Sequence, residues 1–216
     1  MLHRLVDIFL HLDRHLAEFV QAHGSSTYAL LFLVIFMETG VVVTPFLPGD
    51  SLLFACGALA TTGALRLSVL LPLLAAAAIV GDNMNYWIGR VVGPRAFSQE
   101  SRFFKREHLV RTQEFYGRHG GKTVFLARFV PIIRTFAPFV AGIGTMPYSR
   151  FLAYSVAGAF SWVGSCTLAG YAFGNIPVVK DNFSLVVIGI IAVSLLPIVV
   201  EYVRAKRRAR TDQVSH

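Results

Sequence analysis

Apolar residues along the chain form segments of two lengths. Residues 67–93, 148–173 and 183–203 are each long enough to cross a bilayer, which takes about 20 apolar residues. Residues 28–43 and 51–62 are also apolar but shorter, and a break that contains two prolines separates them. The pattern therefore predicts three spanning helices and a pair of shorter helices, neither of which reaches across the membrane.

Residues 2–22 have a different pattern, in which apolar side chains recur at helical spacing with charged and histidine side chains between them. This is typical of an amphipathic helix that lies at the membrane surface. We therefore divide the chain into an N-terminal amphipathic helix (1–27), a membrane domain (28–175), and a last spanning helix with a basic tail (176–216).

Two of the predicted spans carry small side chains at every fourth residue. These are Ala77, Gly81, Asn85, Gly89 and Gly93 on the first, and Ala157, Ser161, Ser165 and Ala169 on the second. Small side chains along one face allow another helix to approach closely. Each row therefore predicts a face of close helix contact.

The composition is that of an integral membrane protein. The chain is 55% hydrophobic and 15% charged, against about 25% charged in soluble proteins. Its 20 basic residues outnumber its 12 acidic ones and gather between the apolar segments, which favours membrane orientation over nucleic-acid binding. Cys56 and Cys166 both lie inside apolar runs, where a small buried residue is favoured over a disulfide or a metal ligand.

Two basic clusters orient the predicted segments, one in residues 94–121 and one after residue 203. Basic residues mark the cytoplasmic side, so the C-terminus is expected to be cytoplasmic. Residues 122–147 must then enter and leave on one face, because two crossings would take about 40 residues. We therefore predict a re-entrant hairpin at about 122–147 and an opposed one at about 28–63. Such an inverted-repeat arrangement resembles the plan of many secondary transporters.

The second predicted hairpin carries Arg128 and Arg134 inside an apolar run that prolines interrupt. An arginine at the bilayer centre costs about 2.5–3.5 kcal/mol on insertion scales, so each needs a partner, water or an anion. A broken helix is tolerated in a membrane only where it is buried in protein or lines a cavity. We therefore predict that these two arginines bind a negatively charged group. A phosphate suits them because each guanidinium can donate two hydrogen bonds to its oxygens.

The first predicted hairpin carries two acids, Glu38 and Asp50. Apolar surroundings disfavour the charged form of a carboxyl group unless an arginine is near, so Glu38 is a candidate for proton exchange. Asp50 fits an N-cap of the second arm equally well. We predict that both acids couple transport to protons or hold the empty site closed. The alternative is that acids and arginines form internal ion pairs, which only hold the hairpins together.

Three more polar residues lie on the span predicted at 67–93, namely Asp82, Asn85 and Arg90. Asp82 and Asn85 form a polar patch that fits either a site or an interhelical hydrogen bond. Arg90 lies near the inner end of the helix, where snorkelling to lipid headgroups is the ordinary explanation. We keep all three as secondary candidates for the site.

The order and spacing of these residues resemble a known family. The elements are Glu38-Thr-Gly, Pro48-Gly-Asp50, Gly81-Asp82 with Tyr86 and Gly89-Arg90, and Arg128-Phe-Val-Pro-Ile-Ile-Arg134 with Pro138 and Ala141-Gly142. From about residue 30 to 175 they resemble the DedA family of bacterial inner-membrane proteins. That family is related to the SNARE-associated, or VTT, domain of eukaryotic lipid scramblases.

The resemblance implies two opposed re-entrant hairpins in the bacterial inner membrane. It also implies lipid movement across the bilayer, of undecaprenyl phosphate or a phospholipid, with a dependence on the proton motive force. The acids and arginines treated as essential in that family fall here on Glu38, Asp50, Arg128 and Arg134. The expected partners are the bilayer, a lipid phosphate headgroup and protons, and the oligomeric state stays open.

Three other functions stay open. A proton-coupled antiporter for small cations or drugs would use the same acids. A lipid phosphatase is disfavoured, because such enzymes commonly rely on a histidine nucleophile or a metal cluster and all seven histidines fall outside the apolar spans. We therefore expect neither enzymatic activity nor a cofactor. A purely architectural protein would keep its activity after its charged pairs are swapped.

Overall fold

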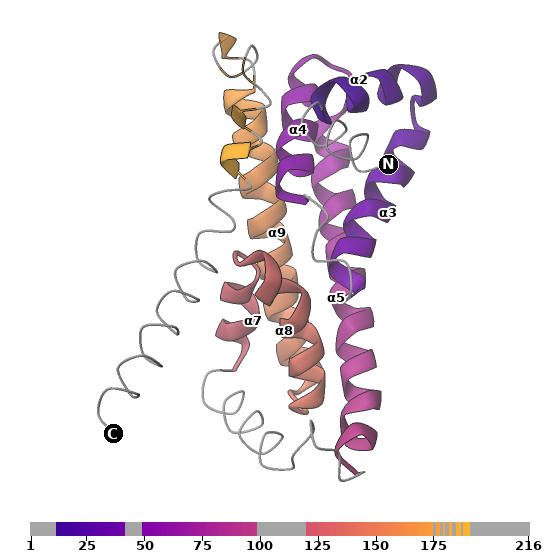
Figure 1. Ribbon diagram of the computed structural model, residues 1–216, viewed down its shortest axis with the longest axis vertical. Helices are drawn as coiled ribbons and strands as arrows, with labels where there is room; N and C mark the ends of the chain where they lie inside the picture. The colour runs from indigo at the N-terminus through magenta and orange to yellow at the C-terminus, as the bar shows by residue number, and fades with distance from the viewer. Residues whose placement is uncertain are drawn as a thin grey trace, which may run out of the picture.

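A computed structural model of the chain describes residues 12–41, 49–98 and 120–174, and single positions between 176 and 190. All regular secondary structure in these residues is α-helical (Figure 1). The helices are α2 (Leu12–His23), α3 (Ser26–Gly40), α4 (Gly49–Thr61), α5 (Leu67–Ser98), α7 (Gly121–Ala127), α8 (Pro131–Ile143) and α9 (Tyr148–Phe173). The predicted all-α class is confirmed for the described part of the chain.

Among the described residues, two helices are long and apolar enough to cross a membrane, α5 and α9. Their apolar spans, Leu67–Val92 and Tyr148–Phe173, contain 26 residues each and match two of the predicted spans. Other predicted segments lie wholly or mostly outside the described residues: the start of the N-terminal helix, the break at 44–50, the basic segment at 94–121, the third span at 183–203, and the basic tail.

The remaining helices of the membrane domain are short. They contain 15 residues in α3, 13 in α4, seven in α7 and 13 in α8, and each falls below the roughly 20 that a span requires. They form two pairs, α3–α4 and α7–α8, in the two regions where hairpins were predicted. Figure 1 shows α3–α4 along the upper half of α5 and α9, and α7–α8 along the lower half.

The two pairs pack on the long helices in the same way. The first helix of each pair packs on the long helix that follows it in the chain, α3 on α5 and α7 on α9. The second helix of each pair packs on the other long helix, α4 on α9 and α8 on α5. The second pair therefore repeats the contacts of the first with α5 and α9 exchanged, and these two long helices run in opposite directions (Figure 1).

Glycines permit the closest of these helix crossings. At both crossings between a long helix and the second helix of a pair, two glycines lie against the backbone of the partner helix. They are Gly57 against Thr167 and Gly170 against Phe54 between α4 and α9, and Gly89 against Phe139 and Gly142 against Tyr86 between α5 and α8. A β-carbon at any of the four would overlap the carbonyl oxygen of the opposed residue.

The small-residue face predicted on α5 is confirmed, but the one predicted on α9 is wrong. On α5, Gly81 lies against the backbone of α3. On α9, Ala157, Ser161 and Ser165 are exposed, whereas the side of the helix that carries Trp162 is buried. The two serine hydroxyl groups donate to carbonyl oxygens of α9 itself, so neither needs a partner on another helix.

Helix α2 packs on α3 and α4. Its Leu16 and Val20 are buried in the core cluster that those helices share with α5 and α9. The structure therefore shows a helix in this part of the predicted N-terminal segment, with Leu16 and Val20 covered by the protein, and its place at the membrane surface stays a prediction.

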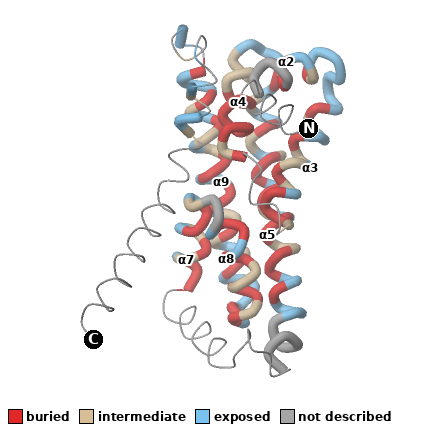
Figure 2. Tube along the Cα trace, viewed as in Figure 1, coloured by how far each residue is buried: buried red, intermediate tan, exposed pale blue. Residues whose placement is uncertain are grey.

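Figure 2 shows that buried residues alternate with intermediate and exposed ones along the helices. The outward side of the long helices is nevertheless apolar as well, with exposed Val80, Trp87, Phe160 and Leu168. Helices that are apolar all round are typical of membrane spans.

Candidate functional site

The four charged residues predicted for the site come from the ends of the short helices. Glu38 lies near the end of α3 and Asp50 near the start of α4. Arg128 directly follows α7, and Arg134 lies near the start of α8. The ends of the two helix pairs meet beside the middle of the long helices (Figure 1). The fold therefore brings all four side chains into one region.

Arg134 is held by both acids of the first helix pair. Its Nη2 donates to Oε1 of Glu38 at 2.6 Å, and its Nη1 donates to Oδ1 of Asp50 at 2.9 Å. The side chains of Arg134 and Glu38 are 4% and 1% exposed, whereas that of Asp50 is 18% exposed. Ion pairs of Arg134 therefore connect the two helix pairs. Of the two acids, Asp50 is the more exposed to solvent.

Arg128 has a different counter-ion. Its Nη1 donates to Oδ2 of Asp82 on α5, and the hydroxyl group of Ser155 on α9 donates to the same oxygen at 2.6 Å. Both charged side chains are buried. Asp82, a secondary candidate from the sequence, is therefore the acid that pairs with Arg128. The alternative that the sequence left open, in which both arginines pair with Glu38 and Asp50, holds for Arg134 alone.

Trp162, which the sequence analysis did not single out, contacts both halves of the cluster. Its Nε1 donates to Oδ1 of Asp50 at 2.7 Å. The centroid of its ring lies 4.3 Å from Cζ of Arg134 and 5.7 Å from Cζ of Arg128, which is within the range of cation–π attraction. The sequence could have indicated Trp162 as a candidate. Tryptophan in spanning helices favours the membrane interfaces, whereas Trp162 lies in the middle of a predicted span.

Both arginines keep unused hydrogen-bond donors. Within the described residues, Nε and Nη2 of Arg128 and Nε of Arg134 have no partner. A buried donor left without a partner costs about 1–3 kcal/mol. A group with several acceptor oxygens, placed beside the two arginines, would satisfy these donors.

The cluster formed by Glu38, Asp50, Asp82, Arg128 and Arg134 carries unequal charge. If all five are ionised, three carboxylates face two guanidinium groups, which leaves one negative charge in excess. Buried charges without partners are costly. The cluster therefore contains one carboxylate group more than it has guanidinium groups.

The other two secondary candidates lie in different places. Asn85 is buried, and its Nδ2 donates to the carbonyl oxygens of Thr39 on α3 at 2.7 Å and of Thr135 on α8 at 3.2 Å. It therefore ties the two helix pairs together beside the cluster. Arg90 is exposed and donates to the hydroxyl group of Tyr86 at 2.8 Å. The structure does not bring Arg90 to the cluster.

Comparison with known proteins identifies the family. Residues 47–172 match the VTT domain, a stretch that includes Asp50, Asp82 and both arginines of the cluster. The chain belongs to the VTT-domain, or DedA, family.

Several relatives of this DedA-family chain are named as membrane proteins. It is 56% identical over 212 residues to "Protein DedA" of Escherichia coli, which covers 97% of both chains. It is 45% identical over 166 residues to an uncharacterized membrane protein of Mycobacterium leprae, covering 76% of this chain and 74% of the relative. The "Inner membrane protein YghB" of E. coli is 32% identical over 162 residues, or 73% of each chain. No solved structure matches the chain.

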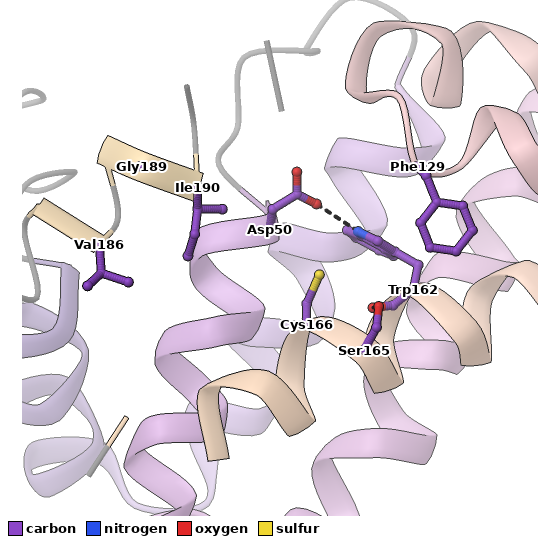
Figure 3. A pocket seen from close by; sticks show the side chains of 8 residues that line it. All are labelled: Asp50, Phe129, Trp162, Ser165, Cys166, Val186, Gly189 and Ile190. Carbon is purple, nitrogen blue, oxygen red and sulfur yellow. Dashed lines mark hydrogen bonds between the residues drawn. The ribbon is translucent and has the colours of Figure 1, made fainter. Parts of the chain in front are cut away.

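A pocket of 440 Å³ adjoins the cluster in this DedA-family protein. Figure 3 shows Asp50 and Trp162 facing each other across a hydrogen bond, with Phe129 beyond the indole ring and Ser165 and Cys166 contributed by α9. The remaining lining residues are Val186, Gly189 and Ile190. The pocket is therefore apolar over most of its wall and charged at the edge that it shares with the cluster.

The described residues contain no group of three histidine, cysteine, aspartate or glutamate side chains placed to hold a metal ion. Cys56 and Cys166 are free thiols, Cys56 buried in the core and Cys166 partly exposed.

Proposed function

We propose that this protein is a transporter, or flippase, that moves a phosphate-bearing lipid across the bacterial inner membrane. Undecaprenyl phosphate and phospholipids are the two candidate substrates. The observation that carries the proposal is the pair of buried arginines, Arg128 and Arg134, whose unused N–H donors lie in one cluster at the ends of two opposed helix pairs.

In this proposal the two guanidinium groups hold the lipid phosphate. Guanidinium forks match phosphate oxygens geometrically, and a charge-assisted hydrogen bond is roughly twice as strong as a neutral one. In the structure, Nη1 of Arg134 donates a hydrogen bond to Asp50, and Nη2 donates one to Glu38. A phosphate therefore competes with these carboxylates, and the empty site is closed by its own acids.

Protonation of a carboxylate opens the site. A proton on Asp50 or Glu38 weakens that acid's hold on Arg134 and removes the excess negative charge, so the site accepts an anion more readily. Release of the proton on the other side of the membrane restores the ion pairs and expels the phosphate. Coupling to the proton motive force follows from this competition.

We further propose that both helix pairs are re-entrant and that the C-terminus is cytoplasmic. The short helices and the inverted packing of the pairs support this topology. The cluster then lies near mid-depth between two loops that enter from opposite faces. Small movements of one pair against the other would expose it to one side at a time.

The test is lipid movement in proteoliposomes, followed by the accessibility of the headgroup of labelled undecaprenyl phosphate or phospholipid, with and without a pH gradient. Vesicles with protein should move one of these lipids faster than empty vesicles, and the gradient should change the rate. If neither lipid moves faster than in empty vesicles, the proposal fails. Phosphate released from the lipid would instead indicate an enzyme, which the proposal excludes.

Arg134→Lys should slow lipid movement by about tenfold to a hundredfold, because a lysine cannot donate in the planar fork and one charged hydrogen bond contributes about 1.5–3 kcal/mol. The matched control is Arg150→Lys, since Arg150 is exposed on α9 and outside the cluster. A full rate for Arg134→Lys would rule out bidentate recognition of the phosphate.

A proton-coupled antiporter for small cations or drugs is the second candidate, favoured by the excess carboxylate and by the partial exposure of Asp50. In this case a proton and a cation alternate on the same acids. Glu38→Gln should then abolish cation-driven proton efflux and leave lipid movement unaffected. The lipid proposal requires instead that Glu38→Gln change the pH dependence of lipid movement.

A further inference from the structure

The pocket beside the cluster has the lining of a hydrocarbon site. Phe129, Val186 and Ile190 present apolar side chains to it, and Gly189 leaves room (Figure 3). Ser165 donates its hydroxyl hydrogen to the carbonyl oxygen of Trp162, within its own helix. Asp50 is the one charged residue in the described lining. The volume of 440 Å³ lies in the range of small-molecule sites, about 300–1,000 Å³.

Two residues of the pocket wall also belong to the site. Asp50 accepts hydrogen bonds from both Arg134 and Trp162, and the Trp162 ring lies against the Arg134 guanidinium. Asp50 and Trp162 therefore separate the pocket from Arg134. If Asp50 moved aside, a group at the edge of the pocket could contact Arg134 directly. Glu38 is buried and is bound by Nη2, the other terminal nitrogen of Arg134.

We propose that this pocket binds the hydrocarbon segment that adjoins the phosphate of the transported lipid. The phosphate takes the place of Asp50 on Arg134, Glu38 stays bound, and Trp162 remains as the wall between chain and headgroup. This inference rests on the proposed function and adds the subsite for the chain. The apolar lining favours the hydrocarbon segment of the lipid, and the guanidinium group of Arg134, behind Asp50, favours its anionic phosphate.

The labelling of Cys166 can show whether a ligand occupies the pocket, because Cys166 lines the pocket and is partly exposed. Cys56 is buried in the core. The experiment measures the rate at which a maleimide labels the full-length protein in maltoside micelles. Farnesyl phosphate, farnesol and inorganic phosphate are the three probes, and Cys166→Ser identifies the labelled thiol. A ligand at ten times its dissociation constant should slow labelling about tenfold, because about one pocket in ten is then empty.

Farnesyl phosphate should protect Cys166 at lower concentration than farnesol, and inorganic phosphate should give no protection, since it lacks a chain. Arg134→Lys should remove the advantage of farnesyl phosphate over farnesol. Equal labelling rates with and without farnesyl phosphate would overturn the inference. So would protection by tetraphenylphosphonium in its place, since the pocket would then be a site for lipophilic cations.

Gly189→Leu tests the same subsite by filling it. Within the described residues, a β-carbon at Gly189 meets no atom within 4 Å, so the larger side chain should be accommodated without disturbing the fold. Gly164→Leu is the matched control, because a β-carbon at Gly164 also meets no described atom within 4 Å and Gly164 does not line the pocket. We expect Gly189→Leu to abolish protection by farnesyl phosphate and to slow lipid movement, and Gly164→Leu to do neither.

The failures of the two proposals are distinguishable. If the wild-type protein moves lipid and Arg134→Lys slows it, but Gly189→Leu has the wild-type rate, the pocket assignment is wrong and the proposed function stands. If the wild-type protein moves no lipid, the proposed function fails, whatever the labelling shows.

Discussion

The indole of Trp162 lies against both arginines of the cluster and donates a hydrogen bond to Asp50. A single buried side chain thus touches the Arg128–Asp82 pair and the Arg134–Glu38–Asp50 group. Movement of either arginine changes the surroundings of the ring. At the residue scale, Trp162 is therefore a positioning residue for the proposed phosphate site, and its fluorescence offers a direct readout.

The chain contains two tryptophans, so Trp87→Phe leaves Trp162 as the sole reporter. Trp87 is 48% exposed on α5 and lies outside the cluster. Titration of this variant with farnesyl phosphate should change the emission of Trp162 to a saturable limit, because the environment of the ring changes when Asp50 leaves Arg134. An unchanged spectrum at concentrations that protect Cys166 would contradict the positioning role.

Trp162→Phe keeps an aromatic ring near the arginines and removes the donor to Asp50. We expect the rate of lipid movement to fall by about tenfold, as for the loss of one hydrogen bond to a charged group. The dependence of this rate on pH should also shift, because Asp50 loses a hydrogen-bond donor that stabilises its charged form. A slower rate with an unchanged pH profile would indicate a merely structural ring.

Asp82→Asn removes the counter-ion of buried Arg128. Removal of one partner of a buried pair costs about 3–5 kcal/mol, because the other charge is left uncompensated. The midpoint of thermal unfolding in detergent should therefore fall clearly below that of the wild-type protein. Glu18→Gln, at an exposed position on α2, serves as the control. A wild-type midpoint for Asp82→Asn would show that Arg128 has another anion beside it.

At the scale of elements, the long helices are joined to the second helix of each pair through reciprocal glycine contacts. Gly57 and Gly170 occupy one crossing, and Gly89 and Gly142 occupy the other. Because the backbones touch there, the crossings fix where the ends of the short helices lie. The position of the charged cluster thus depends on residues that carry no charge.

Gly57→Leu should destabilise the protein, because its side chain would have to displace the backbone of α9 at Thr167. Overpacking of a close-packed interior costs about 1–3 kcal/mol and occasionally more. Gly164→Leu, where open space surrounds the new side chain, should leave the midpoint of thermal unfolding within experimental error. Equal midpoints for the two variants would mean that the α4–α9 crossing is not close-packed in the protein.

At the scale of the whole molecule, the second helix pair repeats the contacts of the first, which supports the proposed entry of the two pairs from opposite faces. The topology can be tested with single cysteines in a Cys166→Ser background. Lys122→Cys and Ser149→Cys, at exposed positions that flank the α7–α8 pair, should react with an impermeant maleimide from the same side. Thr62→Cys, after α4, should react from the opposite side. Labelling of positions 122 and 149 from different sides would end the hairpin proposal.

The sequence alone was sufficient to predict the helical class, the two long apolar helices and the broken segment that carries Arg128 and Arg134. These follow from local properties: the length of apolar runs, the effect of proline on a helix, and the cost of burying a charge in lipid. Glu38 and Asp50 could be nominated in the same way, because a carboxyl group in an apolar run stands out without knowledge of its neighbours.

Only the tertiary structure decided which charges meet. Arg128 pairs with Asp82, 46 residues away in the chain, and Arg134 pairs with Glu38, 96 residues away. No local sequence pattern shows which acid pairs with which arginine. The buried side of α9 was likewise decided by packing: the sequence analysis predicted contact along the row that begins at Ala157, whereas the backbone contact is made at Gly170. The sequence by itself determined which side chains need partners; the helix crossings determined which partners come within reach, because hydrogen bonds and close packing act only over a few ångströms.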